Sequence, residues 1–176
     1  IIGLAFLSPL NKVSHPSSTT SLRQFTSLYS QKRRASSKDY YNLKNYYFLT
    51  QSQINQAHQL KVSGIGDSIL VRTDPHFKRL FKHYVADDQV GRQLSAGPAA
   101  IQRLKAQNDL APIVLVNLGT NGPMTVAAII DLVDEIGSAH QIFWVNNRVP
   151  KKAWQDTNNQ HLDLAAKQRQ NLHVIN

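Results

Sequence analysis

Apolar positions follow two different spacings from residue 50 onwards, and they predict helices and strands in alternation. Five short runs rich in apolar and β-branched residues have the length of strands, which we expect over 61–66, 84–90, 112–117, 141–146 and 172–175. Apolar residues at helical spacing predict helices over 50–60, 74–83, 97–107, 125–136 and 157–169. Alternating strands and helices indicate right-handed βαβ units, so the predicted fold is a three-layer α/β sandwich around a central parallel sheet.

The first third of the chain has a different composition. Residues 1–60 carry seven Lys or Arg side chains against one acidic residue, Asp39, so most of the net charge of +9 lies there. The rest of the chain is nearly balanced, which argues against a nucleic-acid groove on the folded part. The segment 11–49 is rich in Ser, Thr and basic residues, and we expect a basic flexible linker there.

The first ten residues are apolar and have no charged segment before them. A membrane-spanning helix needs about 20 apolar residues, so this stretch predicts either the end of a transmembrane helix or a buried strand, and we favour the former. The expected organisation is therefore a membrane stub over 1–10, a linker over 11–49 and a folded domain over 50–176. The absence of cysteine excludes disulfides and thiolate chemistry but leaves the compartment open.

Ser68 is the first candidate for chemistry. It follows the strand predicted over 61–66, where Gly66 allows a close turn into the next helix. Open α/β proteins bind ligands at this edge of the sheet, and free N–H groups at a helix start can stabilise an oxyanion. Taken alone, however, the residue type and position favour a simple helix N-cap, because caps are far commoner than nucleophiles.

Two further loops belong to the same predicted edge. Gly91 follows the second strand, and Asn121 lies in Leu118-Gly-Thr-Asn-Gly122 after the third. An Asn-Gly pair often forms a hairpin turn, but here a strong helix pattern follows instead of a partner strand. Three successive loops carrying Ser68, Gly91 and Asn121 together favour a hydrolase or acyl-transfer site.

These residues resemble a known family. Gly66-Asp67-Ser68, Gly91 and Gly119-Thr-Asn121 are similar to the first three sequence blocks of the SGNH (GDSL-type) esterases and acyltransferases. Residues 61–176 are more similar still to the extracellular catalytic domain of peptidoglycan O-acetyltransferases, on the basis of Ile65-Gly-Asp-Ser68, Val90-Gly-Arg-Gln93, Leu118-Gly-Thr-Asn-Gly122, Phe143-Trp-Val-Asn146, Val149-Pro150 and Trp154. The G-x-S-x-G elbow of ordinary α/β-hydrolases is absent, since position 70 is Leu.

The resemblance implies a flavodoxin-like SGNH domain in which Ser68 is the nucleophile. The backbone N–H groups of Ser68 and Gly91, with the Asn121 side chain, would form the oxyanion hole. It further implies acetyl transfer to sugar hydroxyls of peptidoglycan strands, with esterase side activity and no cofactor, metal or nucleic-acid partner. In that family a membrane acyltransferase domain supplies the acetyl group and tethers the domain on the extracellular face of the cell membrane.

The general base is the main departure from the family pattern. The family places an Asp-x-x-His block after the last strand, and the sequence ends at Asn176 before such a block. We therefore expect that the chain as given lacks the catalytic Asp and His, and that its sheet is truncated at the C-terminal edge, leaving Val174 and Ile175 uncovered. His161 and His173 are expected to be structural or solvated rather than catalytic, and no pair of histidines is clustered as a zinc site requires.

Two other functions remain open at this stage. One is a non-catalytic module that binds cell-wall glycan on an SGNH scaffold, and the other is a general carbohydrate esterase. An Asp-x-x-His segment would favour an enzyme, and its absence from the protein would favour the module.

Overall fold

The structure is a computed structural model that describes residues 43–45 and 47–176. The chain divides into two compact units, 1–58 and 59–176. The stub predicted over 1–10 and most of the linker predicted over 11–49 lie outside the described residues. Among the residues that are described, no helix is long and apolar enough to cross a membrane.

The described part of the first unit contains one complete helix, α3 (Gln51–Ala57). Its start follows from the sequence, because Thr50 and Gln53 form a capping box. The Thr50 hydroxyl accepts from Gln53 N at 3.2 Å, and the Gln53 side-chain oxygen accepts from Thr50 N at 2.8 Å. Residues 43–45 and 47 are also helical. The two units divide between His58 and Gln59, further along the chain than the domain boundary expected at residue 50.

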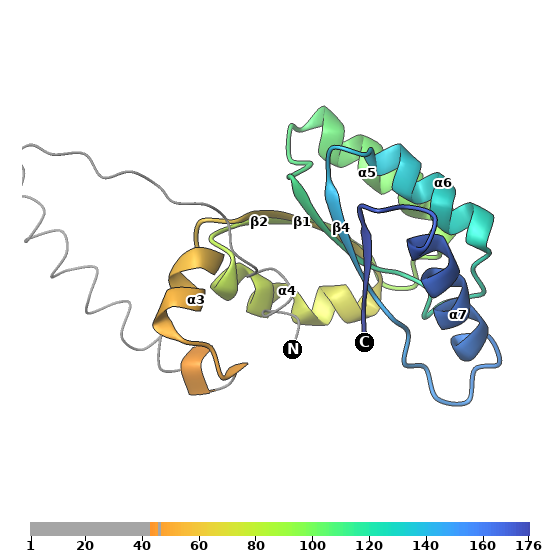
Figure 1. Cartoon of the computed structure of the whole chain (residues 1–176), viewed down its shortest axis with the longest axis horizontal. Helices are drawn as coiled ribbons and strands as arrows, with labels where there is room; N and C mark the ends of the chain where they lie inside the picture. Colours follow the sequence, from red (N-terminus) through yellow and green to blue (C-terminus); the bar gives the residue numbers. More distant parts are fainter. Residues whose placement is uncertain (1–42, 46) are drawn as a thin grey trace, which may run out of the picture. The chain divides into compact units, whose positions relative to one another are not determined.

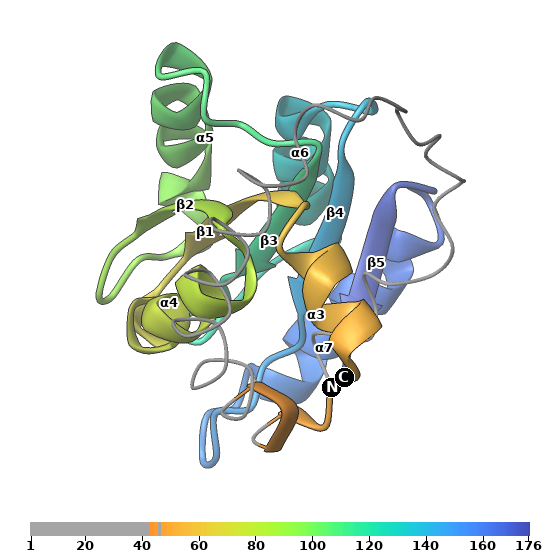
Figure 2. The ribbon, with the colours of Figure 1, turned by 90° about the vertical axis from the view of Figure 1, so that its left-hand side faces the viewer.

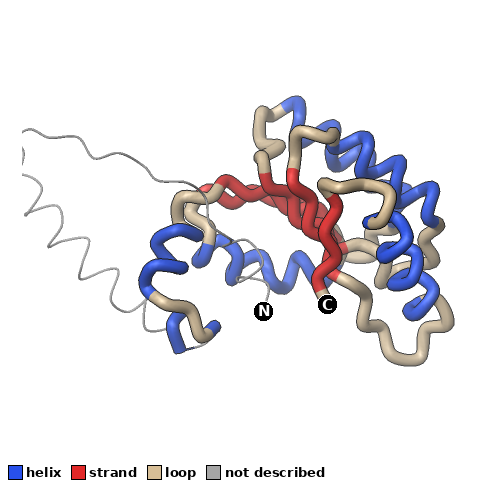
Figure 3. The backbone as a smooth tube through the Cα atoms, viewed as in Figure 1, coloured by secondary structure: helices blue, strands red, loops and turns tan. Residues whose placement is uncertain are grey.

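The second unit is built on a five-stranded sheet (Figure 3). Its strands are β1 (Lys61–Gly66), β2 (His83–Asp88), β3 (Ile113–Asn117), β4 (Gln141–Val145) and β5 (Leu172–Ile175). All are parallel, in the order β2-β1-β3-β4-β5. The predicted parallel α/β sheet is therefore confirmed, and each strand lies close to its predicted range.

Helices cover the two faces of the sheet unequally (Figures 1 and 2). α5 (Gly97–Ala106), α6 (Val126–Ile136) and α7 (Gln155–Ala166) share one continuous core with apolar residues of β3, β4 and β5. α4 (Ser68–Leu80) has no residue in that core and packs on β1 and β2 from the opposite face. Because the connections are right-handed, the helix after β1 lies on one face and the helices after β2, β3 and β4 lie on the other.

The prediction for α4 was wrong at its start, which is Ser68 and not residue 74. Pro75 suggested a first turn, because proline is favoured there and lacks the N–H that a helix interior needs. In the structure Pro75 lies inside the helix, so the carbonyl of Val71 receives no helical N–H from that position. The helix begins earlier because Asp67 caps it, as described for the site below.

The expectation of uncovered apolar residues on β5 was also wrong for the two residues named. Val174 packs against the core shared with α7, and Ile175 is only 7% exposed. α7 packs on β5 and covers the face of the strand that carries Val174.

Tyr84 on β2 places a polar atom in the packing between β2 and α4. Its side chain is buried, and its hydroxyl has no hydrogen-bond partner among the described residues. Gly64 on β1 leaves room for it, because a Cβ there would lie 2.3 Å from the hydroxyl oxygen. Burial raises the pKa of Tyr84 above its ordinary value, and the charges of Asp74 and Asp88 raise it further.

We expect Tyr84→Phe to raise the free energy of unfolding by about 1 kcal/mol, because it removes a buried hydroxyl whose desolvation is not compensated. Urea denaturation at neutral pH measures the change. Tyr84→Leu serves as the control, since it also removes the ring that contacts Phe77 at 5.5 Å between centroids and should lower stability. A loss of stability in Tyr84→Phe would mean that the hydroxyl has a hydrogen-bond partner, such as a bound water.

Candidate active site

The predicted site lies where β1, β2 and β3 end side by side. Gly66 at the end of β1 is in register with Asp88 of β2 and with Asn117 of β3. Backbone hydrogen bonds continue past the strands: Asp67 N donates to Asn117 O at 3.0 Å, and Gln89 N donates to Gly66 O at 3.1 Å. The three loops that carry Ser68, Gly91 and Asn121 therefore start from one edge of the sheet, as expected for parallel strands.

Ser68 is the first residue of α4 and not its cap, so the N-cap interpretation of this serine was wrong. The cap is Asp67, whose carboxylate accepts from Ile69 N at 3.0 Å. Ser68 is half-buried, and its hydroxyl makes no hydrogen bond to another residue that the structure describes. With the capping role taken by its neighbour, this hydroxyl is available for chemistry.

Asp67 connects the first loop to the third. Its side chain is fully buried, and its second carboxylate oxygen accepts from the Thr120 hydroxyl at 2.5 Å. A carboxylate at a helix N-terminus is stabilised by the free N–H groups and by the helix dipole. One buried side chain therefore fixes both the start of α4 and the residue that precedes Asn121.

Gly91 occupies a tight turn after β2. Arg92 N donates to Gln89 O at 3.2 Å, and Gly91 has φ +78, which is the conformation that a type II turn requires at its third position. Nothing lies within 4 Å of where a Cβ would be. Glycine is thus needed at this position for its backbone conformation and not for lack of space.

The side chain of Arg92 connects this turn to the ends of β1 and β2. Its side chain is buried and donates to Gly66 O at 3.3 Å, to the Asp87 carbonyl and to the Asp87 carboxylate at 2.5 Å. Arg103 of α5 also binds the Asp87 carboxylate, at 2.6 and 3.1 Å. Burial alone would raise the pKa of Asp87, but hydrogen bonds from Arg103 and Arg92 outweigh it and hold that pKa below its ordinary value.

Asn121 completes the contact between the three loops. Its side-chain Nδ2 donates to Arg92 O and to the Thr120 hydroxyl oxygen, both at 3.2 Å. The structure therefore brings all three predicted site residues into one hydrogen-bonded set of loops, through Asp67 and Thr120 on one side and Asn121 and Arg92 on the other. In this state the amide hydrogens of Asn121 are directed at protein acceptors.

Asn158 of α7 holds the Asn121 loop from behind, and the sequence analysis did not identify it. It is fully buried and all of its amide is used: Nδ2 donates to Gly119 O at 3.0 Å and to Gly122 O at 2.9 Å, and Oδ1 accepts from Met124 N at 2.7 Å. Trp144 of β4 adds a bond from its indole N–H to Leu118 O at 3.2 Å. The available sequence signal was an asparagine pair, Asn158-Asn159, in a predicted helix that such residues do not favour.

The two histidines weighed against the family pattern are engaged elsewhere. His161 Nδ1 lies 2.6 Å from Met124 O, and His173 Nε2 lies 2.9 Å from the side-chain oxygen of Gln141. Within the described residues, no group of three or more His, Cys, Asp or Glu side chains is arranged to hold a metal ion.

We expect Asn158→Asp to lower the free energy of unfolding by about 3 kcal/mol. The change replaces two donated hydrogen bonds by a buried carboxylate facing two carbonyl oxygens. Asn159→Asp is the matched control on the same helix, because it removes only the bond from Asn159 Nδ2 to Asn147 O, and at a half-buried position. Urea denaturation of the two variants compares them directly, and equal losses would contradict the role given to Asn158.

No protein-family model matches the chain. It is 36% identical over 111 residues to the peptidoglycan O-acetyltransferase OatA of Listeria monocytogenes, covering 63% of this chain and 17% of that protein. It is 33% identical over 128 residues to YrhL of Bacillus subtilis, provisionally named a peptidoglycan O-acetyltransferase, covering 68% of this chain and 20% of the relative. The chain thus spans about a fifth of the length of these relatives.

Among solved structures, the C-terminal catalytic domain of OatA from Streptococcus pneumoniae matches with a TM-score of 0.56 at 14% identity. The match covers 65% of this chain and 67% of that domain. At this identity the likeness bears on the fold alone, and the fold agrees with the one that the sequence resemblance implied. The chain therefore carries an SGNH-type, OatA-like domain.

Proposed function

We propose that this domain transfers acetyl groups to sugar hydroxyls of peptidoglycan through an acyl-enzyme on Ser68, with ester hydrolysis as a side activity. One observation carries the proposal: a serine hydroxyl free of other described partners lies at a helix start, in a set of loops that hydrogen-bond to one another. The names of the sequence relatives support peptidoglycan as the acceptor.

The reaction has two steps. Ser68 Oγ attacks the carbonyl carbon of an acetyl ester, its proton passes to a base, and the tetrahedral intermediate expels the donor alcohol as it takes up a proton. A sugar hydroxyl then attacks the acetyl-serine carbonyl carbon and gives its proton to the base. The second tetrahedral intermediate breaks its bond to Ser68 Oγ, which takes up that proton, and the acetylated sugar is released. Water in place of the sugar gives the esterase reaction.

The oxyanion of each intermediate would be bound by the N–H groups of Ser68 and Gly91 and by the Asn121 amide. Ser68 is at the first position of α4, where N–H groups have no acceptor within the helix. Asn121 donates to Arg92 O at 3.2 Å before substrate binds, so its amide must exchange this long bond for the oxyanion. Such contacts commonly tighten only in the reacting complex.

The base for Ser68 is proposed to be a histidine held by an aspartate, in the Asp-x-x-His segment that the family resemblance places after the last strand. This assignment leaves His161 and His173 in the structural hydrogen bonds described above. Serine reacts poorly without such a base, so the activity tests below use the full-length protein.

The proposal extends to the place of the domain in the cell. Residues 1–10 would be the end of a membrane helix and 11–49 a linker from a membrane acyltransferase domain that supplies the acetyl group. The domain would then work on the extracellular face of the cell membrane, next to the glycan strands.

Ser68→Ala is expected to abolish both acetyl transfer and ester hydrolysis, because it removes the atom that carries the acetyl group. The fold should remain intact, since Asp67 and not Ser68 caps α4. Mass spectrometry of a chitooligosaccharide acceptor incubated with an acetyl ester measures transfer, and circular dichroism checks the fold. Activity close to that of the parent protein would exclude Ser68 as the nucleophile.

Asn121→Ala is expected to lower kcat by about two to three orders of magnitude with a much smaller change in KM, because an oxyanion donor acts mainly on the transition state. Gln107→Ala is the control, since it removes an exposed amide side chain at the end of α5 and should leave kcat and KM unchanged. A raised KM with unchanged kcat in Asn121→Ala would instead make this residue a substrate-binding group.

The same assays separate the alternative functions. Hydrolysis of acetyl esters without transfer to any sugar would indicate a carbohydrate esterase. Binding of peptidoglycan by a full-length protein that neither transfers nor hydrolyses acetyl groups would indicate a non-catalytic glycan-binding module.

A further inference from the structure

The loop between β4 and α7, residues 146–154, concentrates positive charge beside the candidate site. It carries Arg148, Lys151 and Lys152, all exposed, and contains no acidic residue. We refer to residues 146–154 as the basic loop. The domain outside it is nearly balanced in charge, so this is a local feature and not a consequence of the high overall charge.

The backbone of the basic loop is held at several points. Asn147 N donates to the Asn159 side-chain oxygen at 2.7 Å, and Asn147 O accepts from Asn159 Nδ2 at 3.0 Å. Val149 N donates to the Gln155 side-chain oxygen at 2.6 Å, and Lys152 N donates to Val149 O at 3.1 Å. The three cations therefore extend from an ordered segment, which reduces the entropy lost when they bind a ligand.

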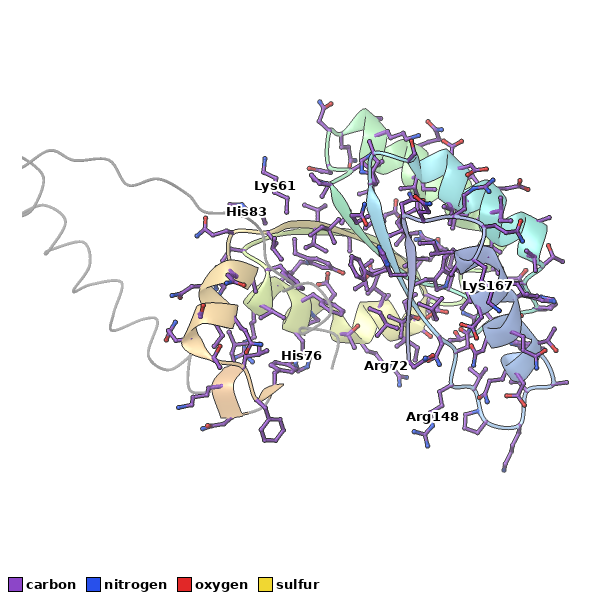
Figure 4. The ribbon with its side chains drawn as sticks, viewed as in Figure 1. Lys61, Arg72, His76, His83, Arg148 and Lys167 are labelled. Atoms are coloured by element: carbon purple, nitrogen blue, oxygen red, sulfur yellow. The ribbon has the colours of Figure 1, made fainter. Side chains whose placement is uncertain are left out.

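The loop begins in direct contact with the site. Asn147 is buried against Gly119, where a Cβ would lie 2.5 Å from the Asn147 amide nitrogen, and Gly119 has φ +113. Gly119 belongs to the same short loop as Asn121. Arg148 is the next residue along the chain, and its side chain points away from the domain (Figure 4). Lys61 and His83 are the first residues of β1 and β2, at the edge of the sheet opposite the candidate site. Figure 4 shows both far from Arg148.

The cations of the basic loop are not neutralised by described residues. Arg92 and Arg103 pair with Asp87, and Arg169 pairs with Asp134. None of the ion pairs within the described part of the chain includes Arg148, Lys151 or Lys152. Lys152 instead has its ammonium group 5.3 Å from the ring centre of the half-buried Trp154.

We propose that the basic loop binds carboxylates on the glycan acceptor, and so selects carboxylate-bearing strands over neutral ones. The inference rests on the proposed function and adds a class of acceptor to it. Arginine and lysine are the natural partners of carboxylates, and their three side chains here are exposed on one short loop next to the candidate site. Peptidoglycan carries such carboxylates on its peptide stems, and on its lactyl ethers where the stem has been removed, whereas chitooligosaccharides carry none.

The test compares two acceptors that differ only in charge: a peptidoglycan fragment with free carboxylates, and the same fragment with its carboxylates amidated. The variant combines Arg148→Gln, Lys151→Gln and Lys152→Gln in the full-length protein. We expect its KM for the free fragment to rise about tenfold, as three exposed charge contacts predict, with little change for the amidated fragment. The parent protein should also lose affinity for the free fragment as salt rises, more steeply than the variant does.

Lys61→Gln combined with Lys82→Gln and Lys167→Gln is the matched control, since it also removes three exposed cations, all outside the basic loop. Hydrolysis of a small acetyl ester should be unchanged in both variants. Calorimetric binding of both fragments to Ser68→Ala, with and without the loop substitutions, tests the inference without any activity. If the full-length protein neither transfers nor hydrolyses acetyl groups, the proposed function fails. The difference in binding between free and amidated fragments still tests whether the basic loop recognises carboxylates. Equal losses of affinity for free and amidated fragments, or no loss for either, would overturn the proposal.

Discussion

The arrangement of the site depends on one buried carboxylate. Asp67 is fully inaccessible to solvent, and each of its oxygens has a definite partner, Ile69 N on one side and the Thr120 hydroxyl on the other. A buried charge without partners would cost several kcal/mol, so the two loops must stay where they satisfy it. Asp67 therefore caps α4 in place of Ser68, and it also fixes Thr120, the neighbour of Asn121, to the start of this helix.

Supports of the site come from two helices, α5 and α7, that lie on the same face of the sheet. Arg92, anchored through Asp87 to Arg103 on α5, holds the ends of β1 and β2 and presents a carbonyl to Asn121. Asn158, on α7, holds the same Asn121 loop at Gly119 and Gly122. The loop is therefore fixed from two elements that are far apart in sequence, and it does not rely on its own short-range contacts.

The sequence predicted the sheet well because the relevant signals are local. The continuous run of β3 and the alternation of strands with helices depend only on neighbouring residues, and both are confirmed by the parallel five-stranded sheet. The start of α4 was wrong because Pro75 is a strong local signal that the cap at Asp67 overrides. Asn158 was missed because its three partners lie more than thirty residues away, and no periodicity reveals such a bond.

The hold on the Asn121 loop has a consequence for the chemical lifetime of the protein. Asparagine followed by glycine is the pair most prone to deamidation, because the next backbone nitrogen can attack the side-chain carbonyl when the chain is free to bend. Asn121-Gly122 is such a pair, and here the amide is bound to Arg92 O while the Gly122 carbonyl is bound by Asn158. Deamidation would turn a neutral donor into a carboxylate close to where an oxyanion is proposed to form. By binding the Gly122 carbonyl, the buried asparagine of α7 restrains the bend in the chain that this attack requires.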